Sequence, residues 1–169
     1  HLANGPPPDP DPDARGAFVG LTPATNRAVL YRAVLEGLAF QSRLMLNGMA
    51  TLGFIGEPRE IRLIGGGSRN PLFLTIKANV FGRPLIVVDE AEGTALGAAL
   101  LGGIAAGLFP GLEAALHGLD RSEHVVEPDS TASRYDALRT MVFEHIHDRL
   151  RPINRGLAEF NAMKGPGPG

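Results

Sequence analysis

The sequence of 169 residues contains no cysteine and no tryptophan, and only 6% of its residues are aromatic. Without cysteine the chain forms no disulfide bond, no thiolate nucleophile and no zinc site built on sulfur. It also lacks an excess of positive charge, because 16 Lys and Arg residues stand against 18 Asp and Glu residues. A nucleic-acid partner is therefore not expected, since proteins that bind nucleic acids carry a basic surface for the phosphate backbone.

The rest of the composition is that of an ordinary globular domain, with 44% hydrophobic residues and a length suited to about one domain. The folded domain is expected to cover 16–160, and 161–169 is expected to form a flexible tail. Residues 1–15 are expected to form a flexible lead-in, because the prolines of this segment disfavour helix and keep the backbone extended.

The chain starts at His1 instead of methionine, so we expect it to start inside a longer gene product or after processing. No charged segment followed by an apolar run opens the sequence, so no signal peptide is predicted.

Short apolar runs alternate with longer segments that have helical periodicity. Thr22 and Pro23 resemble the start of a helix, with a capping hydroxyl followed by proline in the first turn. We predict strands at 17–21, 61–64 and 85–88, and helices at 23–51, 70–81, 93–107 and 131–160. The alternation predicts an α/β fold with parallel-type strand pairing. Unpaired strand edges would allow a homodimer.

One segment, 93–112, carries no charge over 20 residues, which is long enough to span a bilayer. Six of these residues are glycine, and Glu92 and Glu113 flank the run where cations would be expected for a membrane helix. We therefore predict a helix buried inside the protein and no membrane association.

The most informative motif is Gly65-Gly66-Gly67-Ser68-Arg69-Asn70, which follows one predicted strand and precedes a predicted helix. Bare glycine backbone lets a ligand approach closely, and a helix N-terminus favours negative charge. The motif has neither the Gly-Lys-Ser/Thr ending of a P-loop nor the Gly-x-Gly-x-x-Gly spacing of dinucleotide sites. Two interpretations stay open: a nucleotide or phosphate site, or a tight connection in which the glycines only turn the chain.

No catalytic or metal-binding residue is predicted. His145 and His147 lie two residues apart and so do not share a helix face, which disfavours a metal site with Asp148. Glu36 is expected to be a structural partner of a nearby arginine. The sequence also lacks a Gly-x-Ser-x-Gly nucleophile elbow.

Taken together, three segments resemble the C-terminal part of FGGY-family carbohydrate kinases, with xylulokinase-like members as the nearest. They keep the order and spacing of that family over about residues 11–109. The first segment is 13–21 together with the Arg-Ala-x-x-Glu-Gly helix at 31–40. The second is 61–71 together with Phe81-Gly82-Arg83-Pro84, and the third is 92–99. Val29, Thr75 and Asn79 differ from the residues that the family usually carries at these places.

The resemblance implies an actin-like ATPase (ribonuclease H-like) fold of which this chain is the C-terminal portion. It implies a cytoplasmic enzyme that uses ATP and Mg²⁺ to phosphorylate a hydroxyl of a sugar or polyol, of the xylulose type. The missing N-terminal kinase domain would supply much of the sugar pocket, and the catalytic aspartate would precede this region. We assign that role to none of Asp9, Asp11 and Asp13, so the chain is expected to be inactive by itself.

The resemblance also implies roles for the glycine motif. Gly65, Gly66 and Gly67 would bring backbone close to the nucleotide near its α-phosphate and ribose, and Ser68 would turn toward phosphate. Asn70 would either cap the following helix or bind the adenine edge. The alternative function is a non-catalytic module that binds nucleotide or serves in assembly.

Overall fold

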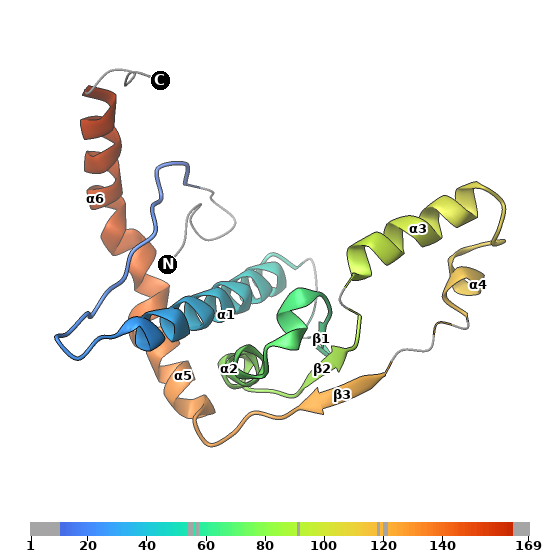
Figure 1. Cartoon of the computed structure of the whole chain (residues 1–169). Helices are drawn as coiled ribbons and strands as arrows, with labels where there is room; N and C mark the ends of the chain where they lie inside the picture. Colours follow the sequence, from blue (N-terminus) through green and yellow to red (C-terminus); the bar gives the residue numbers. More distant parts are fainter. Residues whose placement is uncertain are drawn as a thin grey trace.

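The computed structural model describes residues 11–53, 56, 58–90, 92–117, 119 and 122–163. Helices and short strands alternate through the first part of the described chain, and helices make up its C-terminal part (Figure 1). In chain order the elements are α1 (Arg27–Thr51), β1 (Arg62–Leu63), the 3₁₀ turn η1 (Gly66–Arg69), α2 (Pro71–Phe81), β2 (Leu85–Val88), α3 (Gly93–Ala105), α4 (Leu112–Leu116), β3 (Glu123–Val126), α5 (Ala132–Leu138), the π-helical turn η2 (Arg139–Phe143) and α6 (Glu144–Met163).

The strands form a small sheet in the order β1-β2-β3. β1 and β2 are parallel, with Leu63 opposite Val87, which confirms the predicted α/β arrangement. β3 pairs antiparallel with β2 and was not predicted, because its four residues include Glu123 and His124 and show no continuous apolar run. Buried Leu85 of β2 packs with Ala78 and other residues of α2, so α2 covers one face of the sheet.

The main core lies between α1, α2 and α5. Its apolar side chains come from one face of each helix. The centre of the Phe40 ring lies 6.0 Å from the centre of the Tyr135 ring and 4.8 Å from that of the Phe143 ring. Buried members of this core are Leu35, Ala39, Phe40, Ile76, Val80 and Tyr135. This packing holds α2 beside α1.

The N-terminal prediction was wrong in two respects. Helix α1 begins at Arg27, because the side chain of Asn26 accepts hydrogen bonds from two backbone N–H groups of its first turn, whereas Thr22 and Thr25 close a separate turn. Residues 17–21 form no strand, and Phe18 is 52% exposed. Among the described strands, none lies alongside this segment, so its apolar residues have no ladder to join.

Helix α3 was predicted to be buried, and this prediction was also wrong. Figure 1 shows α3 and α4 extending away from the α1–α2–α5 core. Only Leu100 and Gly103 of α3 are buried, and Leu101 is 62% exposed. Among the described residues, no helix combines the length and apolar character that a bilayer crossing requires.

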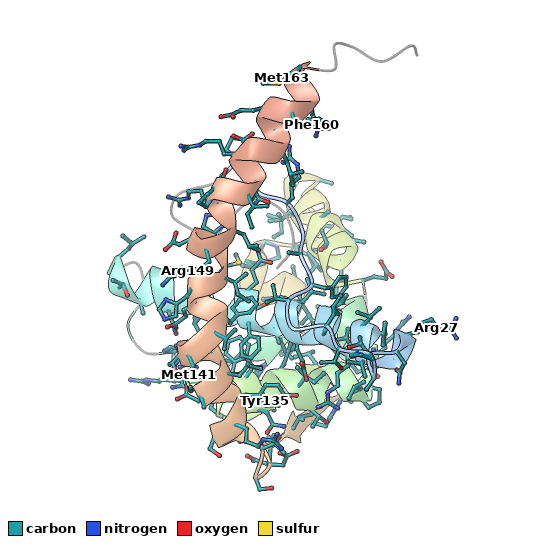
Figure 2. The ribbon with its side chains drawn as sticks, turned by 90° about the vertical axis from the view of Figure 1, so that its left-hand side faces the viewer. Arg27, Tyr135, Met141, Arg149, Phe160 and Met163 are labelled. Carbon is teal, nitrogen blue, oxygen red and sulfur yellow. The ribbon has the colours of Figure 1, made fainter. Side chains whose placement is uncertain are left out.

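The final helical segment is confirmed as two helices joined by a π turn, and α6 rises beyond the rest of the molecule toward Met163 (Figure 2). It therefore includes the first three residues of the predicted tail, and 164–169 lie outside the described residues. The described end of the predicted lead-in packs on this helix, since Asp11 Oδ2 lies 3.6 Å from Nε2 of buried His147. Residues 1–10 lie outside the description.

Candidate functional site

The glycine motif forms a tight turn at the carboxyl end of β1. Gly65 has a φ of +88°, a backbone conformation that side-chain-bearing residues rarely adopt, and its N–H donates to the carbonyl oxygen of Glu90 over 2.8 Å. The next residues continue as η1, in which the N–H of Ser68 donates to the Gly65 carbonyl at 3.0 Å. The turn therefore leads directly from the sheet into α2.

The surface of this turn is open. A Cβ atom placed on Gly65 or Gly66 would meet no other atom within 4 Å, and one on Gly67 would touch the Phe73 ring at 3.5 Å. Among the described residues, no side chain therefore fills the space next to the first two glycines. The open space leaves room for a flat or bulky ligand next to this backbone.

The side chains next to the turn are held by hydrogen bonds. Asn70 caps α2, with its Oδ1 accepting from the Phe73 N–H at 3.2 Å, so the predicted capping role is observed. Its Nδ2 lies 3.2 Å from the hydroxyl oxygen of Tyr31 on α1. The Ser68 hydroxyl donates to the Gly65 carbonyl at 2.7 Å. Sequence analysis missed Tyr31, whose only signal is an aromatic residue in the first turns of a capped helix.

A second turn lies beside the first, where β2 leads into α3. A Cβ on Gly93 would come within 2.9 Å of Ile64 Cδ1, so the start of α3 touches the end of β1. Two parallel neighbouring strands thus each lead into a helix N-terminus at the same sheet edge. In open α/β sheets, ligands bind outside the carboxyl ends of such strands, where helix dipoles favour negative charge.

No cluster of three or more His, Cys, Asp or Glu side chains able to hold a metal ion occurs among the described residues. The histidine motif near the C-terminus is part of the packing of α6. Nε2 of His147 lies 3.2 Å from the Arg151 guanidinium, and the carboxylate of Asp11 is close to both.

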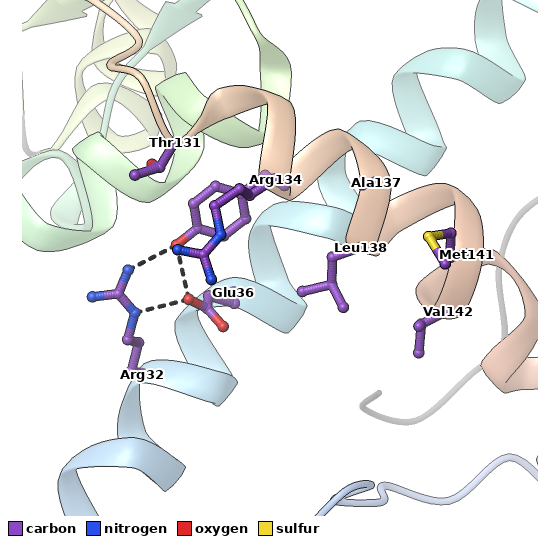
Figure 3. Close-up of a pocket in the computed structure, with 9 residues that line it drawn as sticks. Arg32, Glu36, Thr131, Arg134, Ala137, Leu138, Met141 and Val142 are labelled. Atoms are coloured by element: carbon purple, nitrogen blue, oxygen red, sulfur yellow. Dashed lines mark hydrogen bonds and ion pairs between the residues drawn. The ribbon is translucent and has the colours of Figure 1, made fainter.

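A polar network joins α1 to α5 beside a cavity of about 570 Å³ (Figure 3). The Tyr135 hydroxyl donates to Glu36 at 2.8 Å and accepts from Arg32 at 2.9 Å, and Arg32 also pairs with Glu36 at 2.8 Å. Burial, followed by the hydrogen bond to Glu36, raises the pKa of Tyr135. The predicted structural role of Glu36 is thus observed, and the network fixes the helix that carries Tyr31.

Two further residues of α2, Asn79 and Lys77, make specific side-chain contacts. Buried Asn79 accepts a hydrogen bond at 2.7 Å from the N–H of Asp129 just before α5. Burial lowers the pKa of Lys77, whose ammonium lies 4.8 Å from the centre of the Phe73 ring. The Asn79 contact ties α2 to the segment before α5, whereas the Lys77 contact with Phe73 lies within α2 itself.

The family model for the FGGY family of carbohydrate kinases, C-terminal domain, matches residues 6–106, which include the glycine turn and both helices around it. The chain belongs to the FGGY family of carbohydrate kinases. The predicted family is confirmed, and the match covers every element that forms the site, from α1 to α3.

Curated FGGY relatives include a glycerol kinase of Dechloromonas aromatica, 41% identical over 153 residues that make up 90% of this chain and 28% of the relative. A glycerol kinase of Paracidovorax citrulli is 40% identical over 126 residues, which are 73% of this chain and 25% of the relative. The chain thus spans about a quarter of the length of these relatives.

Solved structures of FGGY kinases share the fold. The xylulose kinase from Rhodospirillum rubrum has a TM-score of 0.66 and 30% identity over 87% of this chain and 30% of that one. Plasmodium falciparum glycerol kinase with ADP has a TM-score of 0.58 and 27% identity over 79% of this chain and 27% of that one. The predicted actin-like ATPase fold is therefore confirmed for this portion.

Proposed function

We propose that the full-length protein transfers the γ-phosphoryl group of ATP to a hydroxyl group of a sugar or polyol, and that the turn at Gly65–Asn70 holds the adenosine part of ATP. The observation that carries the proposal is the uncovered glycine backbone at the end of a parallel strand, directly before a helix N-terminus. Membership of a kinase family and the similarity to a glycerol kinase solved with ADP support it.

The residues of the turn fit a nucleotide. Gly65 and Gly66 offer backbone with no Cβ in the way, and the positive end of the α2 dipole faces the turn, which favours a ligand that carries phosphate. ATP supplies the phosphoryl group. Phosphoryl transfer depends mainly on positioning and charge stabilisation, so the contribution of this chain is to position the nucleotide.

Mg²⁺ would accompany ATP, as in other phosphoryl-transfer enzymes. Because the described residues gather no cluster of acidic or histidine ligands, we assign no residue of this chain to the metal. We assign the catalytic base and most of the acceptor pocket to an N-terminal kinase domain. Two leucines more than half exposed, Leu101 on α3 and Leu108 just after it, support a partner domain on that side.

The acceptor is a sugar or polyol in this proposal, and two candidates are favoured by different comparisons. The curated relatives are named glycerol kinases, and the solved structures include xylulose kinases. The sequence analysis favoured xylulose. A coupled assay that follows ADP release with glycerol and with xylulose decides between them, and turnover of neither would contradict the proposed substrate class.

The nucleotide site is tested by Gly66→Val in the full-length protein. The added Cβ meets no atom of the described residues within 4 Å, so we expect the variant to keep its stability while the valine side chain blocks the space over the turn. We expect the Kd for ADP, measured by calorimetry, to rise at least about tenfold, which corresponds to ~1.4 kcal/mol. Gly48→Val is the matched control, because its side chain on α1 also meets open space. An unchanged Kd in Gly66→Val would mean that the glycines only turn the chain.

The two roles considered for Asn70 are separated by Asn70→Asp. The carboxylate keeps the capping acceptor for the Phe73 N–H but removes the amide N–H donor. We expect the thermal midpoint to stay unchanged or rise, since a negative charge at a helix N-terminus is favourable. ADP affinity should fall if the amide binds the base, whereas unchanged affinity would leave Asn70 with the capping role only.

A further inference from the structure

Tyr31 connects α1 to the edge of the glycine turn. The residue is 55% exposed, yet its hydroxyl oxygen lies 3.2 Å from Nδ2 of Asn70, the residue at which the turn passes into α2. The ring therefore extends from α1 toward the turn with part of its surface uncovered. The open backbone of Gly65 and Gly66 belongs to the same turn.

The hydrogen bonds of Asn70 leave specific groups for a ligand. Its Oδ1 accepts from the Phe73 N–H, and one N–H of its amide points to the Tyr31 hydroxyl. The second amide N–H has no partner among the described residues, and neither has the hydroxyl hydrogen of Tyr31 if its oxygen accepts from Asn70. One Asn70 amide N–H and the Tyr31 O–H are then left as hydrogen-bond donors beside the turn. They can donate to the ring nitrogens of a purine, which are acceptors.

We propose that Tyr31 is a further nucleotide-binding residue, with its ring forming the wall on which the purine base stacks and its hydroxyl fixing the orientation of the Asn70 amide. The inference rests on the proposed nucleotide site and adds a preference for purine over pyrimidine nucleotides. Aromatic rings bind bases through stacking, which is stronger for a larger base surface. The Arg32–Glu36–Tyr135 network, which begins at the residue after Tyr31, keeps the helix that carries Tyr31 in place.

The experiment measures the Kd of the full-length protein for ADP and for CDP by calorimetry, together with the thermal midpoint. Tyr31→Leu removes the ring, and we expect the Kd for ADP to rise by about tenfold or more, as for other base–aromatic contacts. Tyr31→Phe keeps the ring and removes the hydroxyl, so a rise of about two- to fivefold is expected. Val29→Ala, also on the exposed surface of α1, is the control and should change neither Kd.

The ratio of the two Kd values separates binding from a structural role. If Tyr31 stacks on the base, Tyr31→Leu reduces the preference for ADP over CDP while the thermal midpoint stays close to that of the unmodified protein. If Tyr31→Leu weakens both nucleotides equally, lowers the midpoint by several degrees, or leaves both Kd values unchanged, the inference is overturned. Loss of ADP binding in Gly66→Val together with normal binding in Tyr31→Leu would refute the role of Tyr31 but not the nucleotide site. Normal ADP binding in both variants would refute the nucleotide site itself.

Discussion

Apolar residues are buried in the α1–α2–α5 core but exposed in the arm that α3 and α4 form (residues 93–116). In the core, Ala39 is 0% exposed and Phe40 is 2% exposed, because three helices enclose them. In the arm, Leu101 and Leu108 are 62% and 75% exposed, although α3 has no charged residue at all. The comparison teaches that apolar character makes a segment suited to burial but does not provide the surface that buries it.

The same contrast applies to function. The residues of the proposed nucleotide turn are held from behind by the core, through Phe73 against the core cluster and Asn79 at Asp129. The arm begins at the same sheet edge and carries uncovered leucines away from it. We therefore expect the core to determine stability of the chain, and the arm to contribute through a contact with the proposed N-terminal domain.

The largest effect is expected for Phe40→Ala in the core. Removing a buried ring that contacts Tyr135 and Phe143 leaves a cavity, so the free energy of unfolding should fall by about 3–5 kcal/mol. Denaturant titration followed by circular dichroism measures this. Met45→Ala on the same helix is the control and should cost less than about 1 kcal/mol, since Met45 is 47% exposed. Equal losses would mean that the core is not where the structure places it.

The core was also the part that the sequence predicted best. Helical periodicity and the Asn70 cap located α2 to within a residue, and the uniformly apolar run located β2 correctly. These signals are local, because they depend on side chains within the same element. The segment 17–21 has an equally apolar run, but a strand needs a neighbour to pair with, and no strand in the described part of the chain lies beside it.

The site was predicted in part for the same reason. Glycine at a positive φ and a capping asparagine leave a clear local mark, so the turn at Gly65–Asn70 was found. The neighbouring Tyr31 lies 39 residues away in sequence and meets Asn70 only through the packing of α1 on α2. Contacts of this kind come from tertiary structure and leave no spacing to recognise.

A smaller effect is expected for Tyr135→Phe, which tests the polar contact inside the core. Losing the hydrogen bonds to Glu36 and Arg32 should lower the free energy of unfolding by about 1 kcal/mol near neutral pH.

The effect of Tyr135→Phe should also depend on pH. Because the pKa of Tyr135 is raised above its ordinary value of 10.0, the unfolded chain releases this proton first, and stability falls as pH rises beyond that value. The variant lacks this fall, so the difference between the two proteins should stay constant below about pH 9 and shrink as pH rises through 10 and beyond. Lys77, with a lowered pKa, acts in the opposite direction in both proteins and cancels in the difference. A constant difference would contradict the buried hydroxyl.

The smallest change in the free energy of unfolding is expected for Leu101→Ala in the arm. This variant tests most directly whether the exposed leucines of the arm differ from the buried residues of the core. Leu101 is 62% exposed, and alanine is at least as good a helix former, so the chain should lose no more than about 0.5 kcal/mol of unfolding free energy. In the full-length protein, Leu101→Ala should lower the free energy of unfolding by more if the N-terminal domain covers α3. The shorter alanine side chain would then lose contacts that leucine makes in a buried interface. The measurement is the difference between the two losses under the same denaturant conditions. A loss in the isolated chain as large as that of Phe40→Ala would show that the arm packs on the core after all, whereas equal small losses in both proteins would place the N-terminal domain away from α3.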